Sequence, residues 1–248
     1  MGFLKKIFGE RTLSAPVNLG VLKADMHSHF IPGIDDGAQT IDDSLALIAE
    51  MKALGYAKVI TTPHIMGDTY KNGKHNILPG LELVRAAVNE KSIDIVVEAS
   101  AEYYIDADLE DKIRARDMLP FSNNYILFEM PFVSEPPNLG SIIFELQLGG
   151  YKPVMAHVER YPFWFTNFNK IIDLRDKGVF IQMNITSLTG IYGLPTKKIA
   201  EKLIDEKMVD FLGSDCHHLG HIELIKKACH LPYLEKAIKN CELLNSKL

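Results

Sequence analysis

Short apolar runs rich in β-branched and aromatic residues alternate along this chain with segments of helical periodicity. The apolar runs predict seven strands, at residues 20–26, 57–62, 93–99, 125–130, 152–157, 179–184 and 209–214. The periodic segments predict helices from Thr40 to Gly55 and at residues 78–91, 138–148, 167–177 and 195–207. Because the strands are apolar and separated by helices, we expect an α/β fold in which helices cover a parallel sheet.

Polar side chains follow nearly every one of these runs. They are His27, His29, His64, Glu102, Glu129, His157, Arg160, Asn184, Asp215 and His217. In a parallel barrel the carboxyl ends of all strands open on one face, so these side chains would meet there. An open doubly wound sheet would gather its polar residues near one switch point, whereas here they are spread evenly along the chain. The distribution therefore favours a closed barrel.

The length of 248 residues suits one barrel domain, which we place at residues 20–248 after an N-terminal extension of residues 1–19. No apolar run approaches the ~20 residues that would span a bilayer, so no integral membrane segment is expected. Residues 1–10 are expected to be a loosely tethered terminal segment, with a short amphipathic turn that contacts a membrane or a partner as the alternative. The sequence leaves the formation of an oligomer open.

Charge and cysteine content narrow the class of protein. The net charge of -5, without a basic stripe, argues against a nucleic-acid partner. Cys216, Cys229 and Cys241 form no CxxC pair, which fits a reducing, cytoplasmic setting rather than a disulfide framework. Cys216 also lacks an arginine six residues later, where Ile222 stands, so a phosphatase with a cysteine nucleophile is not supported.

The histidines and carboxylates after the strands have the composition of a metal centre. His27 and His29 are two residues apart, so on an extended segment their rings project to one side and can bind one ion. Imidazole and carboxylate without a thiolate pair suit Mn, Fe or Zn in a catalytic site, and several carboxylates suit more than one ion. Such a centre activates water near neutral pH and neutralises a phosphoryl oxygen, which is hydrolytic chemistry.

Arg160 stands three residues beyond His157. Its planar guanidinium can hold a phosphate through two hydrogen bonds, which makes it the candidate catalytic residue for a phosphoryl substrate. The alternative for Arg160 is an ordinary ion pair at the surface or at an interface.

Five motifs in order resemble the polymerase-and-histidinol-phosphatase (PHP) superfamily, and most closely its bacterial capsule-type metal-dependent tyrosine-protein phosphatases. They are DMHSHFIPGIDDG (25–37), TTPHI (61–65), SAEYY (100–104), AHVERY (156–161) and GSDCH (213–217). The resemblance runs from about residue 22 to residue 220. It implies a distorted seven-stranded (β/α)7 TIM-like barrel with two or three divalent metal ions, Mn being expected and Fe or Zn the alternatives.

The resemblance also implies roles for individual residues. His27, His29, Glu102 and Asp215 would serve one ion, and Glu102 would bridge to a second ion held also by His157. Asp36, His64 and His217 would complete the coordination. Metal-activated hydroxide would attack a phosphotyrosine in line, and Arg160 would stabilise the charge of the transition state. The implied partner is a tyrosine-phosphorylated protein, the tail of a kinase that controls capsule or exopolysaccharide synthesis.

One departure concerns the substrate. Relatives of this kind often carry a second arginine after the SDxH motif, and the segment SDCHHLGHIELIKK has none. His218, His221 or Lys226 is the expected substitute in substrate binding, with a weaker affinity for phosphate as the alternative.

Three alternatives share the barrel. A small-molecule phosphoesterase acting on a metabolite such as histidinol phosphate would use the same metal site. An amidohydrolase commonly bridges its metals with a modified lysine, a place that Glu102 takes here. A non-catalytic regulator would bind a phosphorylated tail without turnover, but its expected mark is the loss of ligands, and every expected ligand position is filled.

Overall fold

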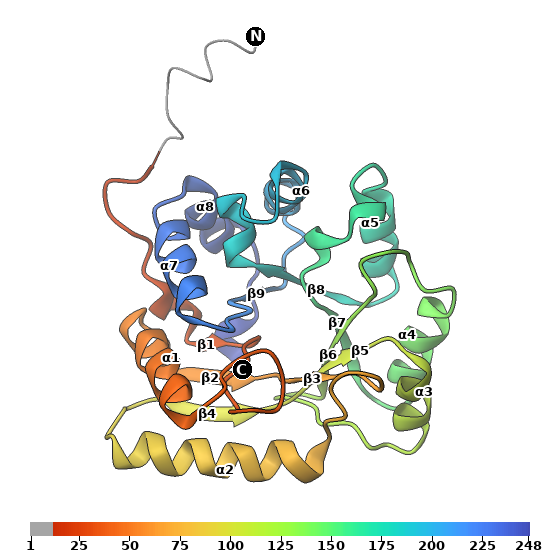
Figure 1. Cartoon of the computed structure of the whole chain (residues 1–248). Helices are drawn as coiled ribbons and strands as arrows, with labels where there is room; N and C mark the ends of the chain where they lie inside the picture. The colour runs from red at the N-terminus through yellow and green to blue at the C-terminus, as the bar shows by residue number, and fades with distance from the viewer. Residues whose placement is uncertain (1–11) are drawn as a thin grey trace.

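A computed structural model describes residues 12–248, and its centre is a curled parallel sheet (Figure 1). Over that range the strands are β1 (Ala24–Asp25), β2 (Lys58–Thr61), β3 (His64–Ile65), β4 (Val96–Ala99), β5 (Glu102–Tyr104), β6 (Tyr125–Glu129), β7 (Lys152–Met155), β8 (Phe180–Asn184) and β9 (Phe211–Gly213). They form two parallel sheets, in the orders β1-β2-β4 and β3-β5-β6-β7-β8-β9. A single parallel bridge between Ser28 and Cys216 brings the segments that follow β1 and β9 together. The α/β class and the TIM-like curl of the sheet are therefore confirmed.

Helices lie around the outside of this curled sheet (Figure 1). They are α1 (Ile41–Ala53), α2 (Lys74–Glu90), α3 (Ala107–Arg114), α4 (Leu139–Leu148), α5 (Asn169–Asp176), α6 (Leu194–Asp205), α7 (Leu219–Ala228) and α8 (Pro232–Asn240). Short 3-10 helices connect them: η2 (Leu19–Leu22), η3 (Val158–Arg160), η4 (Pro162–Trp164), η5 (Ile185–Thr189) and η6 (Asn245–Lys247).

Helix α1 begins and ends where its sequence predicts. The Thr40 hydroxyl accepts from the backbone N–H of Asp43, and the Asp43 carboxylate accepts from the backbone N–H of Thr40. Gly55 follows the helix at φ 103°, a conformation that glycine tolerates best. A side chain there would also meet the backbone nitrogen of Gly20 at 2.9 Å, so this glycine allows the helix to pack close to η2.

Three predicted boundaries were wrong by three residues or more. The strand expected from residue 93 begins only at Val96. The run 20–26 begins as the helix η2, and only Ala24–Asp25 pairs as a strand. The helix expected from residue 78 starts at Lys74, because Asn76 accepts from the backbone N–H of Gly73 and caps an earlier turn. Helices α3, α7 and α8 were not predicted from the sequence. Helix α3 buries only Leu109 and Ile113, so its apolar stripe is too narrow to be recognised.

An apolar cluster fills the barrel beneath the strand ends that carry the polar residues. It takes side chains from β2, β6, β7 and β9 and from the segments beside them, and it consists of Met26, Ile60, Phe121, Tyr125, Leu127, Val154, Ala156 and Phe211. All of them are buried. The polar residues at the carboxyl ends therefore lie above a closely packed apolar floor, which closes the barrel to water from below.

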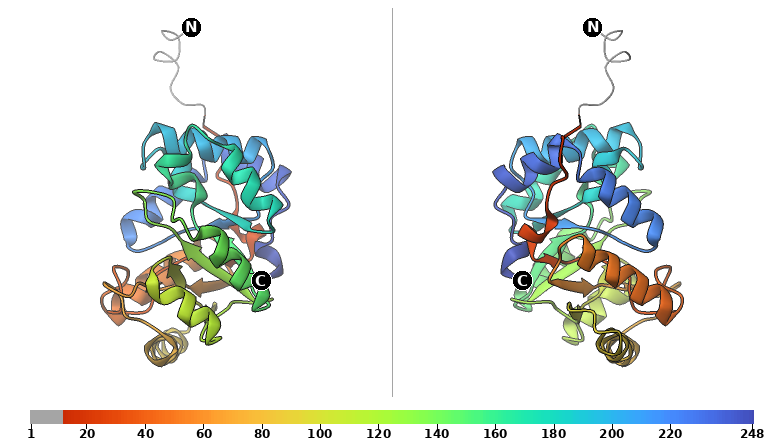
Figure 2. Two further views of the ribbon diagram at one scale, coloured as in Figure 1. Left: turned by 90° about the vertical axis from the view of Figure 1, so that its right-hand side faces the viewer. Right: turned by 90° about the vertical axis from the view of Figure 1, so that its left-hand side faces the viewer.

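The segment before β1 lies along the C-terminal helices (Figure 2). The backbone N–H groups of Leu13 and Val17 donate to the carbonyls of His230 and Cys229, which join α7 to α8. The interpretation of residues 1–10 as a tail or a membrane contact lies outside the described residues. Within residues 12–248, no helix is long and apolar enough to cross a bilayer.

Candidate metal centre

A pocket of about 510 Å³ opens at the carboxyl ends of the strands. Candidate ligands, the candidate arginine and aromatic side chains line it together: Asp36, His64, Met66, Tyr70, Tyr104, Glu129, Phe132, His157, Arg160, Tyr192, Asp215, His217, His218 and His221. The polar residues that follow separate strands in the sequence thus converge on one face, as expected for a barrel of parallel strands.

Four buried residues form the deepest group of donor atoms: His27, His29, Glu102 and Asp215. Nε2 of His27 lies 3.0 Å from a Glu102 oxygen and 3.4 Å from an Asp215 oxygen. Nε2 of His29 lies 3.5 and 3.6 Å from the same two oxygens. Two imidazole nitrogens and two carboxylate oxygens around one point are a suitable donor set for a divalent transition metal.

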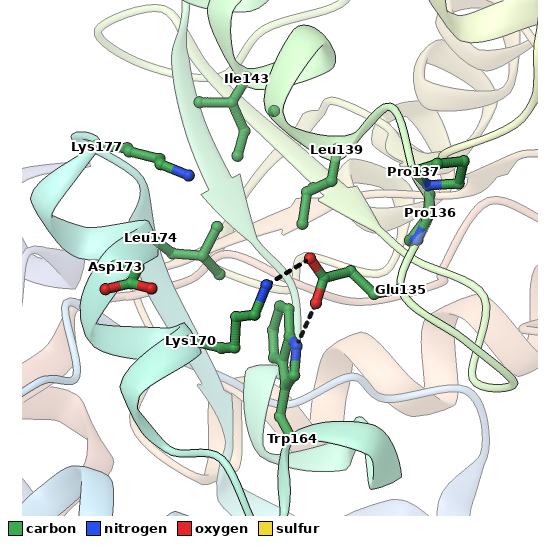
Figure 3. A pocket seen from close by; sticks show the side chains of 11 residues that line it. Glu135, Pro136, Pro137, Leu139, Ile143, Trp164, Lys170, Asp173, Leu174 and Lys177 are labelled. Carbon is green, nitrogen blue, oxygen red and sulfur yellow. Dashed lines mark hydrogen bonds and ion pairs between the residues drawn. The ribbon is translucent and has the colours of Figure 1, made fainter.

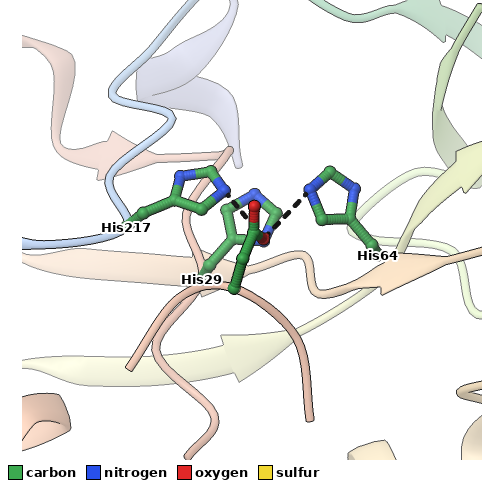
Figure 4. A group of neighbouring side chains, drawn as sticks. His29, His64 and His217 are labelled. Carbon is green, nitrogen blue, oxygen red and sulfur yellow. Dashed lines mark ion pairs between the residues drawn. The ribbon is translucent and has the colours of Figure 1, made fainter. Parts of the chain in front are cut away.

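A second group lies nearer to solvent and contains His29, Asp36, His64 and His217 (Figure 4). One oxygen of Asp36 lies 3.5 Å from Nε2 of His64 and 3.4 Å from Nε2 of His217. The ring of His217 stacks on that of His29 at 3.9 Å between centroids. Asp36 comes from the loop after β1, so this group joins the β1, β3 and β9 ends of the barrel.

The carboxylate of Glu129 completes a third group with His64 and Glu102. Nδ1 of His64 lies 3.2 Å from Glu102 and 3.1 Å from Glu129. Nε2 of His157 lies 3.0 Å from Glu102 and 3.6 Å from Glu129. The sequence places Glu129 at a strand end without assigning it a role, and its position between two histidines makes it a further candidate ligand.

Side chains behind these groups orient the rings. Nδ1 of His27 lies 3.0 Å from Oε1 of Gln182, and Nδ1 of His29 lies 2.8 Å from Oδ2 of Asp35. With Nδ1 donating outward, Nε2 of each ring is the atom that faces the carboxylates. Asp215 is held similarly, because the side-chain amide of Asn184 donates to its Oδ2 at 2.7 Å.

Sequence reasoning missed Gln182 and Asp35. A weak signal for each is present: Gln182 shares a strand face with Asn184, and Asp35 is the first acid of the DDG segment.

The backbone is strained at two candidate ligands. His157 and Asp215 have φ of 32° and 49°, in the left-handed region that non-glycine residues seldom adopt. Each lies two residues beyond a strand end, where the left-handed turn lets the side chain reach the centre. Such strain is typical of functional sites.

The charges of this site are strongly coupled. Burial disfavours the charged form of Glu102, yet His27 and His64 outweigh burial and hold the pKa of its carboxyl well below the usual range. Burial likewise disfavours a charged His27, but Glu102 and Asp215 prevail and raise its pKa to about 10. A hydrogen bond with His217 is the largest influence on Asp36 and lowers its pKa to about 2. The lowered pKa values keep these carboxylates negatively charged, so they require compensating positive charge nearby.

The donor atoms pass a simple test of fit to metal ions. Within residues 12–248, Nε2 of His29 and Nδ1 of His64 are buried and make no hydrogen bond of good geometry, although carboxylate oxygens lie 3.1 to 3.6 Å away. Buried nitrogens of this kind are rare unless something else satisfies them. Each of the two belongs to a group of ligand atoms within 4.8 Å of one another. The residues present therefore fit a centre of divalent ions.

Arg160 lies at the wall of the pocket beside this centre. Its Nη1 donates to Oδ2 of Asp215 at 3.1 Å, the carboxylate whose other oxygen faces His27 and His29. Of the residues considered as substitutes for a second arginine, His218 and His221 line the pocket. The expectation for Lys226 was wrong: it lies in the last turn of α7 and pairs with Glu50 and Glu223, both at 2.9 Å, away from the pocket lining.

Comparison with known proteins identifies relatives over most of the chain. Residues 23–240 match the family model for capsular polysaccharide synthesis, CpsB/CapC. The chain is 30% identical over 196 residues to the tyrosine-protein phosphatase YwqE of Bacillus subtilis, covering 79% of this chain and 77% of YwqE.

Two solved structures resemble the fold. One, from work on YwqE of Bacillus subtilis and CpsB of Streptococcus pneumoniae, described as unique metal-dependent tyrosine phosphatases, superposes with a TM-score of 0.79 at 27% identity and 90% coverage of both chains. The histidinol phosphate phosphatase of Lactococcus lactis superposes with a TM-score of 0.51 at 16% identity, covering 82% of this chain and 93% of its own, and this likeness concerns the fold alone.

Proposed function

Because this chain belongs to the CpsB/CapC family of capsular polysaccharide synthesis proteins, we propose that it is a metal-dependent tyrosine-protein phosphatase. The observation that carries the proposal is the position of Glu102, whose carboxylate faces His27, His29, His64 and His157 at 3.0 to 3.5 Å. A carboxylate shared by four imidazoles is suited to bridge metal ions. The relatives' names supply the substrate, a phosphorylated tyrosine.

The ligands follow from the three groups of donor atoms. His27, His29, Glu102 and Asp215 would hold one ion, and Glu102, Glu129 and His157 a second. Asp36, His64 and His217 would hold a third or complete the coordination of the second. Mn is the ion we propose, with Fe and Zn as alternatives. When bound, such ions lower the pKa of water and neutralise charge on a phosphoryl group.

Arg160 would bind the phosphoryl group. Its guanidinium carries five N–H donors in a planar fork, of which Asp215 takes one at 3.1 Å. The bond to Asp215 orients the guanidinium toward the ligand cluster, so a phosphate held by the remaining donors would lie next to the centre. Arginine retains its charge at all physiological pH values, so it would stabilise the additional negative charge of the transition state.

His218 and His221 would contribute the remaining substrate contacts, in the place where relatives often carry an arginine. The His218 ring lies tilted against that of His221, at 4.1 Å between centroids. Nδ1 of His221 lies 3.2 Å from the backbone nitrogen of His217 and 3.0 Å from the carbonyl of Asp215. These contacts hold both rings at the pocket, where they line one wall.

The barrel itself would have seven strands by this account. Strands β2 and β3 are separated only by Thr62 and Pro63, and β4 and β5 only by Ser100 and Ala101. Each pair therefore behaves as one bent strand, and the bridge from Ser28 to Cys216 would close the barrel. We propose one domain at residues 20–248 that contains the whole site.

The physiological substrate would be the tyrosine-rich tail of a kinase that controls capsule or exopolysaccharide synthesis. The family's role in capsular polysaccharide synthesis supports this partner. A cytoplasmic setting agrees with Cys216, Cys229 and Cys241, which are buried and free.

The proposal is tested by phosphate release from a phosphotyrosine peptide and from histidinol phosphate, with manganese present and with His29→Ala and Arg160→Ala as controls. We expect rapid turnover of the peptide and its loss in both variants. Turnover of histidinol phosphate alone would contradict the proposal and assign the chain to metabolism. Bound metal with turnover of neither substrate would contradict it as well and indicate a non-catalytic regulator.

A further inference from the structure

Two loops that flank the pocket meet across Arg160. The carbon at the centre of the Arg160 guanidinium lies 4.8 Å from the ring centre of Phe132, in the loop before α4, and 4.3 Å from that of Tyr192, between η5 and α6. Both rings line the pocket. Contacts of a cation with two aromatic faces hold the guanidinium in place and hold the two loops beside the same opening.

The loop before α4 is fixed at both ends. At its start the backbone N–H of Met130 donates to the hydroxyl of Tyr161 at 2.9 Å. Further on, the Glu135 carboxylate accepts from Nε1 of Trp164 at 2.9 Å and from Nζ of Lys170 at 3.2 Å (Figure 3). The cavity of about 180 Å³ drawn there therefore has its carboxylate already satisfied, and we assign it to anchoring the loop.

The residues beside the two rings are apolar and face water. Val133 is 92% exposed and Phe132 40%, while Ile191 is 54% and Leu194 69% exposed. We call these residues, Phe132, Val133, Ile191 and Leu194, the lip. Single exposed apolar side chains are common, but here they occur on both loops that border one pocket. Exposing them costs free energy that burial against a ligand would recover.

We propose that the lip binds apolar side chains that flank the phosphotyrosine of a polypeptide substrate. This inference rests on the proposed function and adds a sequence preference to it. A phosphotyrosine that reaches the centre carries peptide on both sides, and that peptide must cross the mouth where the lip lies. The lip is thus continuous with the site that would take the phosphoryl group.

The charge around the lip favours a peptide over a membrane. Residues 131–138 contain one charged side chain, Glu135, and residues 189–196 contain none; the basic residues close by are Arg160, which lies against the rings of Phe132 and Tyr192, and Lys197 and Lys198, which follow in α6. Peripheral binding to anionic membranes commonly relies on lysine and arginine beside the apolar residues. The net charge of -5 works against such binding too.

The test uses two phosphotyrosine peptides of equal charge, which differ only in carrying leucine or serine on each side of the phosphotyrosine. We expect the wild-type protein to favour the leucine peptide roughly tenfold in kcat/KM, the effect of removing about one leucine side chain from water. In Val133→Ser/Ile191→Ser that ratio should fall toward one. Hydrolysis of 4-nitrophenyl phosphate, which has no flanking residues, should stay unchanged in the double variant.

Leu148→Ser is the matched control. Leu148 is 68% exposed and ends α4, which leads to the amino end of β7, the opposite end of the barrel from the pocket. This variant should retain the wild-type preference. Affinity for a non-hydrolysable phosphonate analogue of each peptide, measured by fluorescence anisotropy, should show the same ratios without turnover.

Equal kcat/KM values for the two peptides in the wild-type protein would contradict the proposed role of the lip, while the proposed phosphatase activity would stand. So would a preference that survives in the double variant. Sedimentation of the wild-type protein with phosphatidylglycerol vesicles, lost in the double variant while peptide kinetics stay unchanged, would assign these residues to a membrane and overturn the proposal. If neither the peptides nor 4-nitrophenyl phosphate is hydrolysed, the result contradicts the proposed function and, with it, the proposed role of the lip.

Discussion

Glu102 lies between His27 and His157, with one carboxylate oxygen 3.0 Å from Nε2 of His27 and the other 3.0 Å from Nε2 of His157. The two histidines come from distant parts of the sequence, after β1 and after β7. Because the strands are parallel and the sheet is curled, their ends meet at the one carboxylate that β5 places in the middle. This relationship makes Glu102 the residue on which the candidate centre depends most.

Glu102→Gln should remove the shared negative charge while leaving the shape of the side chain. We expect the loss of at least one metal ion per chain and a fall in kcat/KM of at least about 100-fold, because both neighbouring groups lose a ligand. Metal content by mass spectrometry and phosphate release measure the two effects. Glu98→Gln, which breaks the surface pair of Glu98 with Lys58 at 2.8 Å, is the control and should change neither.

Asp35→Ala should weaken metal binding without removing a direct ligand. Asp35 accepts from the His29 ring at 2.8 Å and from the backbone N–H groups of Gly37 and His64. Loss of such a support typically lowers metal affinity about 10- to 100-fold. Titration of the metal-free protein with manganese measures the change. An affinity equal to that of the wild-type protein would show that Asp35 does not orient His29.

Arg160→Lys should behave almost like Arg160→Ala. Lysine retains the positive charge but lacks the planar fork that can bind both Asp215 and a phosphoryl group. We expect kcat/KM for a phosphotyrosine peptide to fall about 100-fold, the magnitude typical of losing one stabilising donor in the transition state. Steady-state kinetics measure this change, and the metal content of the variant is measured in parallel. Wild-type kinetics in the lysine variant would contradict a role for the guanidinium geometry.

Thiol reagents should not inhibit the native protein. Burial raises the pKa of the Cys229 thiol to about 11 and raises the pKa values of Cys216 and Cys241 too. A raised pKa means that at pH 8 almost no reactive thiolate is present. Iodoacetamide at pH 8 should leave phosphatase activity intact, whereas the same reagent should label the three cysteines after unfolding in guanidinium chloride. Rapid inactivation would point to a cysteine in the chemistry.

Thr40→Ala should destabilise the protein without affecting the centre directly. The change removes the side-chain cap of α1, which typically costs about 1 kcal/mol. Unfolding in urea should show a lower midpoint with an unchanged slope. Helix α1 starts at Ile41, at the end of the loop that carries Asp36, so metal affinity should be measured as well. We expect it to stay at the wild-type value.

Sequence pattern was sufficient for those parts of the site that follow strands directly. His27, His29, His64, Glu102, His157, Asp215 and His217 stand at or just beyond strand ends, and parallel topology alone requires their convergence. Arg160 also follows a predicted strand, the run at 152–157, whereas Asp36 was assigned from the resemblance of the motif DMHSHFIPGIDDG. The structure brings all of these residues to one pocket or to the buried groups beneath it.

The sequence pattern did not reveal the contacts that depend on how the curled sheet arranges the carboxyl ends of its strands. Glu129 lies at a strand end like Asn184, yet only the structure shows that Glu129 faces His64 and His157 while Asn184 supports Asp215. Gln182 and Asp35 act through rings 155 and 6 residues away, and their residue types carry no metal signal of their own. Lys226 sits in a helix that was not predicted, so its direction away from the pocket was not foreseeable either.

The most direct test of the central claim is phosphate release from a phosphotyrosine peptide by protein stripped with a chelator and then supplied again with manganese. We predict no release after stripping, recovery on addition of manganese, and no recovery in Glu102→Gln. Full activity in the stripped protein, or no activity in a protein carrying two or three bound ions, would contradict the assignment of this chain as a metal-dependent tyrosine-protein phosphatase.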